Sequence, residues 1–177
     1  MIQAHGNSIY ASKAERVGAT ASVDELIARL KDVQKELKHP LVSAKNLGLN
    51  LSVFSVNLNY ATRDKEDFVS VFVNAEVISS QAPLVSGLED DVSIPKLAVS
   101  IERPKQIEVS FLDEELKQQT ATFSDLAARW IQHGVDKLNG VSIIDKLNTR
   151  RKKSVRGHLR RISEQKIETN YKLVYAD

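Results

Sequence analysis

The sequence predicts an α+β domain. Three observations support this class: two segments with helical hydrophobic period, a Val- and Phe-rich middle with strand period, and a basic segment of helical length near the end. A chain of 177 residues that is 42% hydrophobic and 27% charged is ordinary for one globular domain with a buried core. The absence of cysteine excludes disulfides, thiolate zinc sites and cysteine nucleophiles.

Three helices are expected. The first begins at Ser22, which forms a capping box with Glu25, and it ends before Pro40. The second covers residues 124–139 and is buried along much of its girth, and Gly140 follows as a left-handed cap. The third is the basic segment 150–163. The apolar stripes of the first two helices consist of Val23, Leu26, Ile27, Leu30, Val33 and Leu37, and of Leu126, Ala127, Trp130, Ile131, Val135 and Leu138.

The middle of the chain changes to strand period. Residues 51–58 and 68–78 are rich in Val and Phe and are predicted to be strands. Residues 107–111 alternate between apolar and polar, as one half-buried strand does. An acidic turn at 113–115 leads to a polar return strand at 117–122, so a hairpin is expected there.

The predicted organisation is a flexible N-terminal arm at 1–20, one domain at 21–165 and a tail at 166–177. No apolar run approaches the ~18 residues that a membrane-spanning helix needs. The N-terminus lacks the basic-then-apolar layout of a secretory signal. We therefore expect a cytoplasmic protein, or one inside an assembled particle or an organelle of endosymbiotic origin, with no membrane contact.

The basic segment is the best candidate for a partner surface. It has no interleaved aromatic residues for base stacking, and Gly157 weakens its helix. A solvated face, an acidic protein partner and RNA all remain open as interpretations. The residues concerned are Arg150, Arg151, Lys152, Lys153, Arg156, Arg160 and Arg161.

Three segments resemble, in order and spacing, the signature motifs of peptide deformylases. The motif G-x-G-L-A-A-x-Q is similar to residues 46–53, E-G-C-L-S-x-P to residues 89–95, and Q-H-E-x-D-H-x-x-G to residues 132–140. This family removes the formyl group from nascent N-termini with a divalent metal held by one Cys and two His. The resemblance implies small antiparallel or mixed sheets around a central helix that carries a degenerate HExxH motif. It also implies a basic C-terminal helix, which active bacterial members use to dock at the ribosome.

The reactive positions of these motifs are altered. The metal-binding Cys falls on Asp91, and the second His falls on Lys137, while His133 is retained. An ammonium has no lone pair for a metal, and two remaining donors fall short of the three of a catalytic zinc site. The general acid/base Glu falls on Gly134, and the carbonyl-polarising Gln falls on Val53. We therefore predict no catalytic residue, no bound metal and no cofactor.

Two placements follow from the same resemblance. Asp91 and Lys137 are predicted to form a buried or half-buried salt bridge beside His133, because a buried carboxylate needs a partner. Gly48, Leu49 and Val92 are predicted to line the former substrate cleft.

The resulting functional prediction is a metal-free pseudoenzyme rather than an enzyme. It is expected to act as a structural or interaction subunit with protein partners in a larger assembly, such as a viral particle or a ribosome. An RNA or ribosome contact would use the basic C-terminal helix. The alternatives are a protein that binds a peptide N-terminus without cleaving it, and an active metal-dependent deformylase or hydrolase with a rearranged site.

Overall fold

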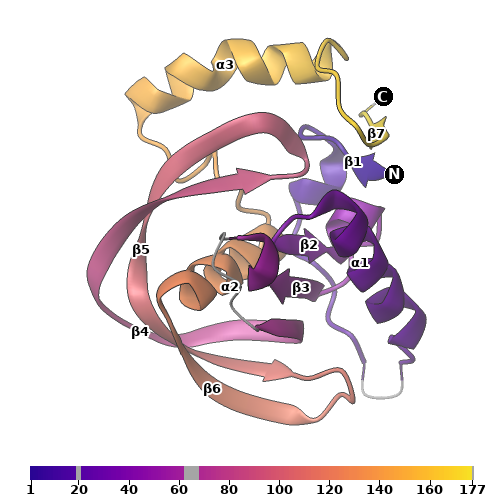
Figure 1. Cartoon of the computed structure of the whole chain (residues 1–177), viewed down its shortest axis with the longest axis vertical. Helices are drawn as coiled ribbons and strands as arrows, with labels where there is room; N and C mark the ends of the chain where they lie inside the picture. The colour runs from indigo at the N-terminus through magenta and orange to yellow at the C-terminus, as the bar shows by residue number, and fades with distance from the viewer. Residues whose placement is uncertain (19–20, 62–67, 177) are drawn as a thin grey trace.

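The computed structural model describes residues 1–18, 21–61 and 68–176, and the predicted α+β class is confirmed (Figure 1). These residues contain three α-helices: α1 (Asp24–Leu37), α2 (Asp125–Leu138) and α3 (Thr149–Ser163). The strands are β1 (Ile2–Gln3), β2 (Leu41–Ser43), β3 (Val53–Asn57), β4 (Val69–Asp91), β5 (Ile94–Leu112), β6 (Gln118–Ser124) and β7 (Leu173–Val174). None of the helices in the described ranges is long and apolar enough to cross a bilayer.

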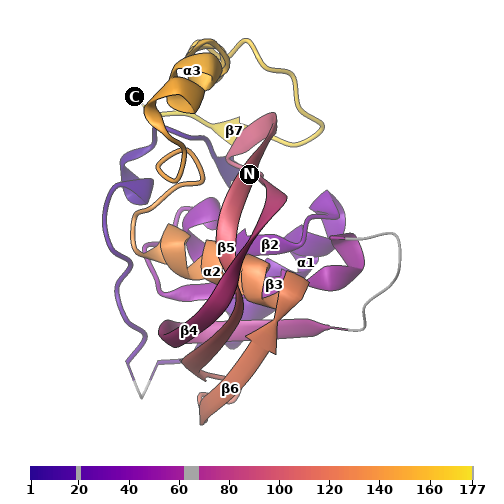
Figure 2. The same cartoon turned by 90° about the vertical axis from the view of Figure 1, so that its left-hand side faces the viewer.

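The main sheet is antiparallel, in the order β2-β3-β4-β5-β6, and β1 pairs in parallel with β7. The hairpin of β4 and β5 is its longest part and curves around one side of the molecule (Figures 1 and 2). Strand β3 pairs with β4 only over Val69–Val73, so the outer part of β4 pairs with β5 alone. The predicted β5–β6 hairpin is present, with β6 starting at Gln118.

The predicted strands 68–78 and 107–111 are correct but far too short. Strand β4 continues to Asp91 and β5 already begins at Ile94. The outer part of β4 is exposed from Glu76 to Ser86 and contains Ser79-Ser80-Gln81 and Pro83, so it shows no alternation of apolar and polar residues. Proline is tolerated at this edge because the register shifts between Gln81 and Leu84.

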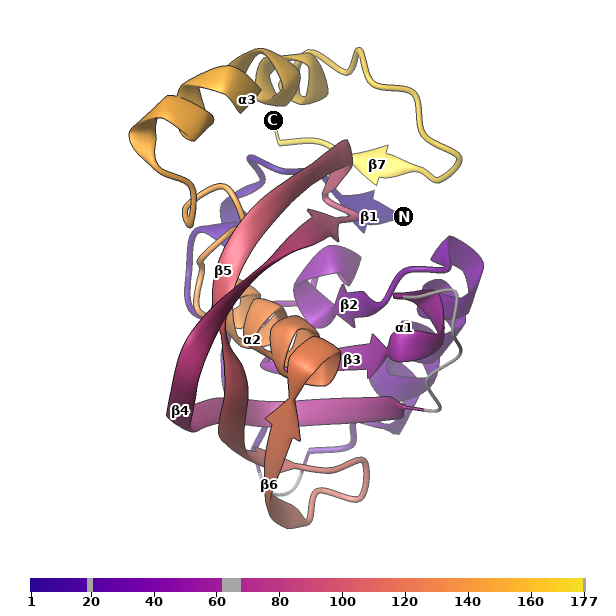
Figure 3. The same cartoon turned by 60° about the vertical axis from the view of Figure 1, so that its left-hand side comes forward.

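Helix α2 lies in the middle of the molecule, between the β4–β5 hairpin and the short strands β2 and β3 (Figure 3). Ten of its residues are buried, which explains why its apolar stripe is so wide. Gly140 follows it with φ +81°, as the left-handed cap predicted. Helix α1 packs on β2 and β3, and α3 packs on β5 through the buried Val155 and Ile162.

The start of α1 differs from the prediction. The helix begins at Asp24 with Val23 as its N-cap residue, and no side chain caps it, so the predicted box of Ser22 and Glu25 is wrong. The helix ends at Leu37, and Lys38 takes a left-handed conformation two residues before Pro40.

The N-terminal segment, expected to be a flexible arm, is hydrogen-bonded to the domain. The amide of Ala14 donates to the carbonyl of Leu138 (2.7 Å). The side chain of Asn74 accepts from the amide of Val17 and donates to its carbonyl, both at 2.9 Å. Strand β1 likewise holds the C-terminal tail through β7. Residues 19–20 of the predicted arm and residue 177 of the tail lie outside the described ranges.

Asn74 is expected to be the main attachment point of residues 14–18. It is buried, lies at a break in the β4 register and has φ +53°, which Asn tolerates better than most residues. Asn74→Ala should therefore lower the free energy of unfolding by about 2–4 kcal/mol, because it removes two buried hydrogen bonds and strains the backbone. Urea unfolding measures the loss, and amide hydrogen exchange should increase first at residues 14–18. The exposed Asn170→Ala is the control and should change neither quantity.

Candidate functional site

The end of β4 meets one side of α2. Asp91 is the last residue of β4, and His133 and Lys137 are one helical turn apart on α2, so both point to the same side. All three are buried, with exposed fractions of 6%, 1% and 4%. The fold thus brings together the residues that the sequence placed at the former metal site.

The predicted salt bridge between Asp91 and Lys137 is confirmed. The ammonium donates to both carboxylate oxygens, with a shortest distance of 2.5 Å. The His133 Nε2 atom lies 3.4 Å from Asp91 Oδ2, longer than a good hydrogen bond. On its other side Lys137 faces the ring of Tyr10, with Nζ 5.0 Å from the ring centroid, so the N-terminal segment covers the pair.

The charged forms of the two partners of this salt bridge are stabilised unequally. Burial disfavours the ionised form of Asp91, but Lys137 and His133 outweigh burial and hold the pKa of Asp91 well below its usual value. Asp91 also accepts from the amide and the hydroxyl of Ser93, both at 2.8 Å. Lys137 has fewer favourable contacts, so burial lowers its pKa despite the attraction of Asp91.

An aromatic ring occupies the space beside Gly134. A Cβ atom at this position would lie 2.5 Å from the ring of Phe54, which stacks on Phe72 at a centroid distance of 5.0 Å. A glutamate therefore cannot replace Gly134 without displacing Phe54. The neighbouring Val53 is completely buried and has no polar group. The proton-transfer and carbonyl-binding side chains of the family motifs are thus absent at both positions.

A second buried charge cluster surrounds Glu89, whose side chain is fully buried. Arg103 binds both of its carboxylate oxygens, at 2.6 and 2.8 Å, and also binds Asp136 at 2.7 Å. Arg129 donates to Glu89 and to the carbonyl of Ile101, both at 2.9 Å. Arg129 therefore joins α2 to both strands of the long hairpin.

Sequence reasoning missed this cluster. Arg129 lies on a helix with apolar period, and neither it nor Arg103 belongs to a charge run. Gly87 lies where this cluster meets β4: a Cβ atom there would be 2.7 Å from the guanidinium of Arg129, so a larger residue would have to shift that side chain. A glycine inside a strand often marks such a close approach.

The residues at the positions that the resemblance assigns to the metal do not fit a metal ion. His133 lies 3.4 Å from Asp91 and 3.5 Å from Glu89. Lys137 already occupies the carboxylate of Asp91, and two arginines occupy that of Glu89. A protonated amine repels a cation and offers it no lone pair. In the described ranges, no group of three or more His, Cys, Asp or Glu side chains gathers in a way that could hold a metal.

A cavity of about 430 Å³ opens beside the salt bridge. Asp91, Ser93 and Lys137 form one wall, and the N-terminal segment and the loop after α2 complete it. Further lining residues are His5, Gly6, Asn7, Tyr10, Ala11, Gly140, Val141, Ser142, Ile144 and Asp145. Burial lowers the pKa of His5, so this imidazole favours its neutral form.

The residues predicted for the substrate cleft do not line this cavity. Gly48 faces the side chain of Gln3, Val92 is buried in the core, and Leu49 is 39% exposed. The cavity instead uses the two neighbours of Val92, Asp91 and Ser93.

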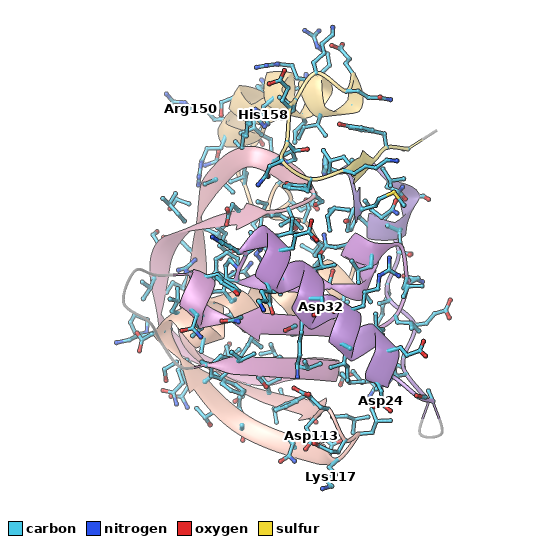
Figure 4. All side chains as sticks on the ribbon, turned by 45° about the vertical axis from the view of Figure 1, so that its right-hand side comes forward. Asp24, Asp32, Asp113, Lys117, Arg150 and His158 are labelled. Carbon is cyan, nitrogen blue, oxygen red and sulfur yellow. The ribbon has the colours of Figure 1, made fainter. Side chains whose placement is uncertain are left out.

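The basic residues of α3 lie at one end of the molecule, opposite the β5–β6 turn with Asp113 and Lys117 (Figure 4). Arg151 is half-buried and donates to the carbonyl of Ser100 at 2.7 Å. The other six are exposed: Arg150, Lys152, Lys153, Arg156, Arg160 and Arg161.

The coupling between Asp91 and Lys137 can be measured directly. Asp91→Asn and Lys137→Met should each lower the free energy of unfolding by about 3–5 kcal/mol, because each leaves an unpaired buried charge or its polar remnant. The double variant should regain much of this loss. The cost should be largest above the usual carboxyl pKa of 3.8 and shrink as pH falls toward the lowered pKa of Asp91, where the wild type also loses the pair.

Urea unfolding of the four proteins gives the coupling energy. The exposed pair Arg16 and Glu76, whose side chains are 60% and 58% exposed, is the control. The double-mutant cycle of this pair (Arg16→Met, Glu76→Gln) should give a coupling energy below about 1 kcal/mol. Additive effects of the Asp91 and Lys137 variants would contradict the buried pair.

The chain is similar to curated proteins over nearly its whole length. It is 28% identical to a peptide deformylase of Christiangramia forsetii, over 97% of this chain and 93% of the relative. It is 30% identical to a peptide deformylase of Synechocystis, over 81% of this chain and 76% of the relative.

These relatives contradict the functional predictions made from the sequence. Proteins named as deformylases conflict with the interpretation of the chain as a non-enzyme, as a structural or interaction subunit and as a metal-free pseudoenzyme. The error lies in one step: altered ligand positions were equated with lost activity. Other residues in a rearranged site can carry a reaction, so that conclusion does not follow.

Solved structures show the same fold. A point mutant of peptide deformylase 1B of Arabidopsis thaliana superimposes with a TM-score of 0.85 at 23% identity, over 93% of this chain and 90% of that one. A Plasmodium falciparum peptide deformylase gives 0.84 at 23% identity, over 97% and 100%. The family model for polypeptide deformylase matches residues 1–153. The chain therefore belongs to the polypeptide deformylase family.

Proposed function

We propose that this chain is a hydrolase that removes an N-terminal formyl group from peptides, with a rearranged site. The observation that carries this proposal is the cavity beside Asp91 and Lys137, because it is lined by two residues that the resemblance aligns with metal-binding positions of the family. The similarity of nearly the whole chain to proteins named peptide deformylase supports the substrate class. The HExxH-like motif on α2 is degenerate in this proposal, with Gly134 and Lys137 at two of its positions.

Lys137 supplies a positive charge at the end of this cavity. A carbonyl oxygen placed there gains negative charge as its carbon is attacked, and a pre-oriented cation stabilises that charge. The salt bridge with Asp91 and the ring of Tyr10 hold the ammonium in place, so little reorganisation is needed during reaction. The adjacent volume of about 430 Å³ is large enough for a formyl-methionyl end.

The test is formate release from an N-formyl-methionyl tripeptide. The wild type should release formate, and Ala11→Trp, which fills the cavity from its wall, should lower kcat/KM by about tenfold or more. The exposed Ala21→Trp introduces the same side chain away from the cavity and is the control. Absence of formate from folded wild type, with or without added Fe²⁺, Ni²⁺ or Zn²⁺, would refute the function. Peptide binding without formate release would refute it too.

We also propose that α3 contacts RNA. Its six exposed basic residues form a surface without an acidic residue between Thr149 and Ser163, and the helix presents them at one end of the molecule (Figure 4). A surface of this charge attracts phosphates without reading sequence.

This contact should depend strongly on salt. Affinity for a labelled RNA hairpin, measured by fluorescence anisotropy, should fall about tenfold or more between roughly 50 and 200 mM salt. Lys152→Glu with Arg156→Glu should weaken binding and flatten the salt dependence. Lys35→Glu with Lys38→Glu makes the same charge change at exposed positions at and just after the end of α1 and should have little effect. Equal effects of the two double variants would show that net charge alone, not α3, drives binding.

A further inference from the structure

The outer part of β4 carries most of the large apolar side chains that are exposed. Eight such side chains are exposed in the described ranges, and five of them lie between positions 77 and 88 of this strand. They are Val77, Ile78, Leu84, Val85 and Leu88, with exposed fractions from 36% to 69%. Single exposed apolar residues are common on protein surfaces, but a group of five on one strand indicates a contact surface.

This part of β4 is also an open edge of the sheet. Strand β3 pairs with β4 over Val69–Val73, and from Glu76 to Asp91 the described strands pair with β4 on the side of β5 alone. One edge of β4 is therefore left without a neighbouring strand. At about 3.3 Å per residue, the stretch from 77 to 88 offers an edge about 40 Å long.

The usual protection of an open edge is largely absent here. Natural proteins keep such edges short, cover them or place charges along them. From residue 77 to residue 88 the sequence contains no Lys, Arg, Asp or Glu, and Pro83 alone lacks an amide hydrogen. The opposite edge of the same sheet, β6, has seven residues and exposes polar side chains such as Thr120 and Thr122. The two edges thus differ as a contact surface differs from a solvated one.

The edge is held in place from behind by α2. Arg129 donates to the carbonyls of Val85 (2.5 Å) and Gly87 (3.3 Å) on β4, and to that of Ile101 (2.9 Å) on β5. The hairpin is therefore ordered before a partner arrives, so little conformational entropy is lost when its edge is paired.

We propose that a second copy of this chain pairs with the edge of β4, antiparallel and about a two-fold axis, so that the two sheets become continuous. Charge favours a second copy. Across such an axis each segment meets itself, so a charged residue would face its own kind, and residues 77–88 carry no charge. A partner selected by charge would find no group of opposite sign in this segment.

The size of the edge sets the expected strength of this dimer. Residues 77–88 supply about half of the roughly 20–30 residues that each side of a standard interface contributes. The dissociation constant should therefore be on the order of micromolar. The inference does not depend on the hydrolase function, because it concerns the hairpin and not the cavity.

Sedimentation of the full chain tests the dimer. Between roughly 1 and 100 μM the wild type should show a monomer–dimer equilibrium. Leu84→Lys with Ser86→Lys places like charges on both copies and should raise the dissociation constant by about tenfold or more. Thr120→Lys with Thr122→Lys makes the same charge change on β6 and should leave it unchanged. A wild type that stays monomeric over this range leaves the edge to another partner and overturns the inference, as do equal effects of the two double variants.

Single cysteines locate the contact, and they also test the inference if the lysine variants do not fold. The chain contains no cysteine, so an introduced thiol is the one thiol in each copy. Residues directly opposite in antiparallel strands have Cα atoms about 4.5–5.5 Å apart, which suits a disulfide. Cysteines placed one at a time at positions 79–86 should give an oxidised dimer at one or more positions, whereas Thr120→Cys should not. A chain that dimerises but is linked at none of the edge positions, or is linked only through Thr120→Cys, has its contact elsewhere and overturns the inference.

Discussion

The centre of the molecule depends on keeping charges neutralised where water is excluded. Asp91 and Lys137 are both almost completely buried, and each would be costly alone. Around them, Glu89 and Asp136 are matched by Arg103 and Arg129, so three carboxylates face three cations along α2. The long hairpin and α2 contribute these charges, and Tyr10 of the N-terminal segment covers Lys137. These ion pairs therefore tie α2 to the long hairpin at the wall of the cavity.

The sequence was sufficient to predict the helices and strands in which buried apolar residues recur at a regular spacing. Helix α2 and the alternation of Ile107, Val109 and Phe111 were predictable because burial imposes a spacing on apolar residues. The full length of the β4–β5 hairpin was not, because exposed strand residues follow no such rule. The docking of residues 1–18 was also missed, since single contacts such as Asn74 with Val17 leave no periodic trace.

The contacts of the candidate site were likewise predictable only in part. The contact of Asp91 with Lys137 was predictable, because two opposite charges fall on positions that the resemblance places together. The cover provided by Tyr10 and the bonds of Arg129 were not, because they join segments far apart in sequence and depend on side-chain reach. The functional prediction was wrong for a different reason. Residue types limit which mechanism is available, but they do not show that the protein has no mechanism.

The packing of Phe54 against Gly134 constrains how this chain can change over generations. A single codon change that introduces an acidic side chain at position 134 would place it against a ring held in the core, so this substitution is costly at the first step. The ring would have to become smaller first, a change that by itself only weakens packing. Changes in the chemistry of this chain are therefore less costly among the groups that already line the cavity than at position 134.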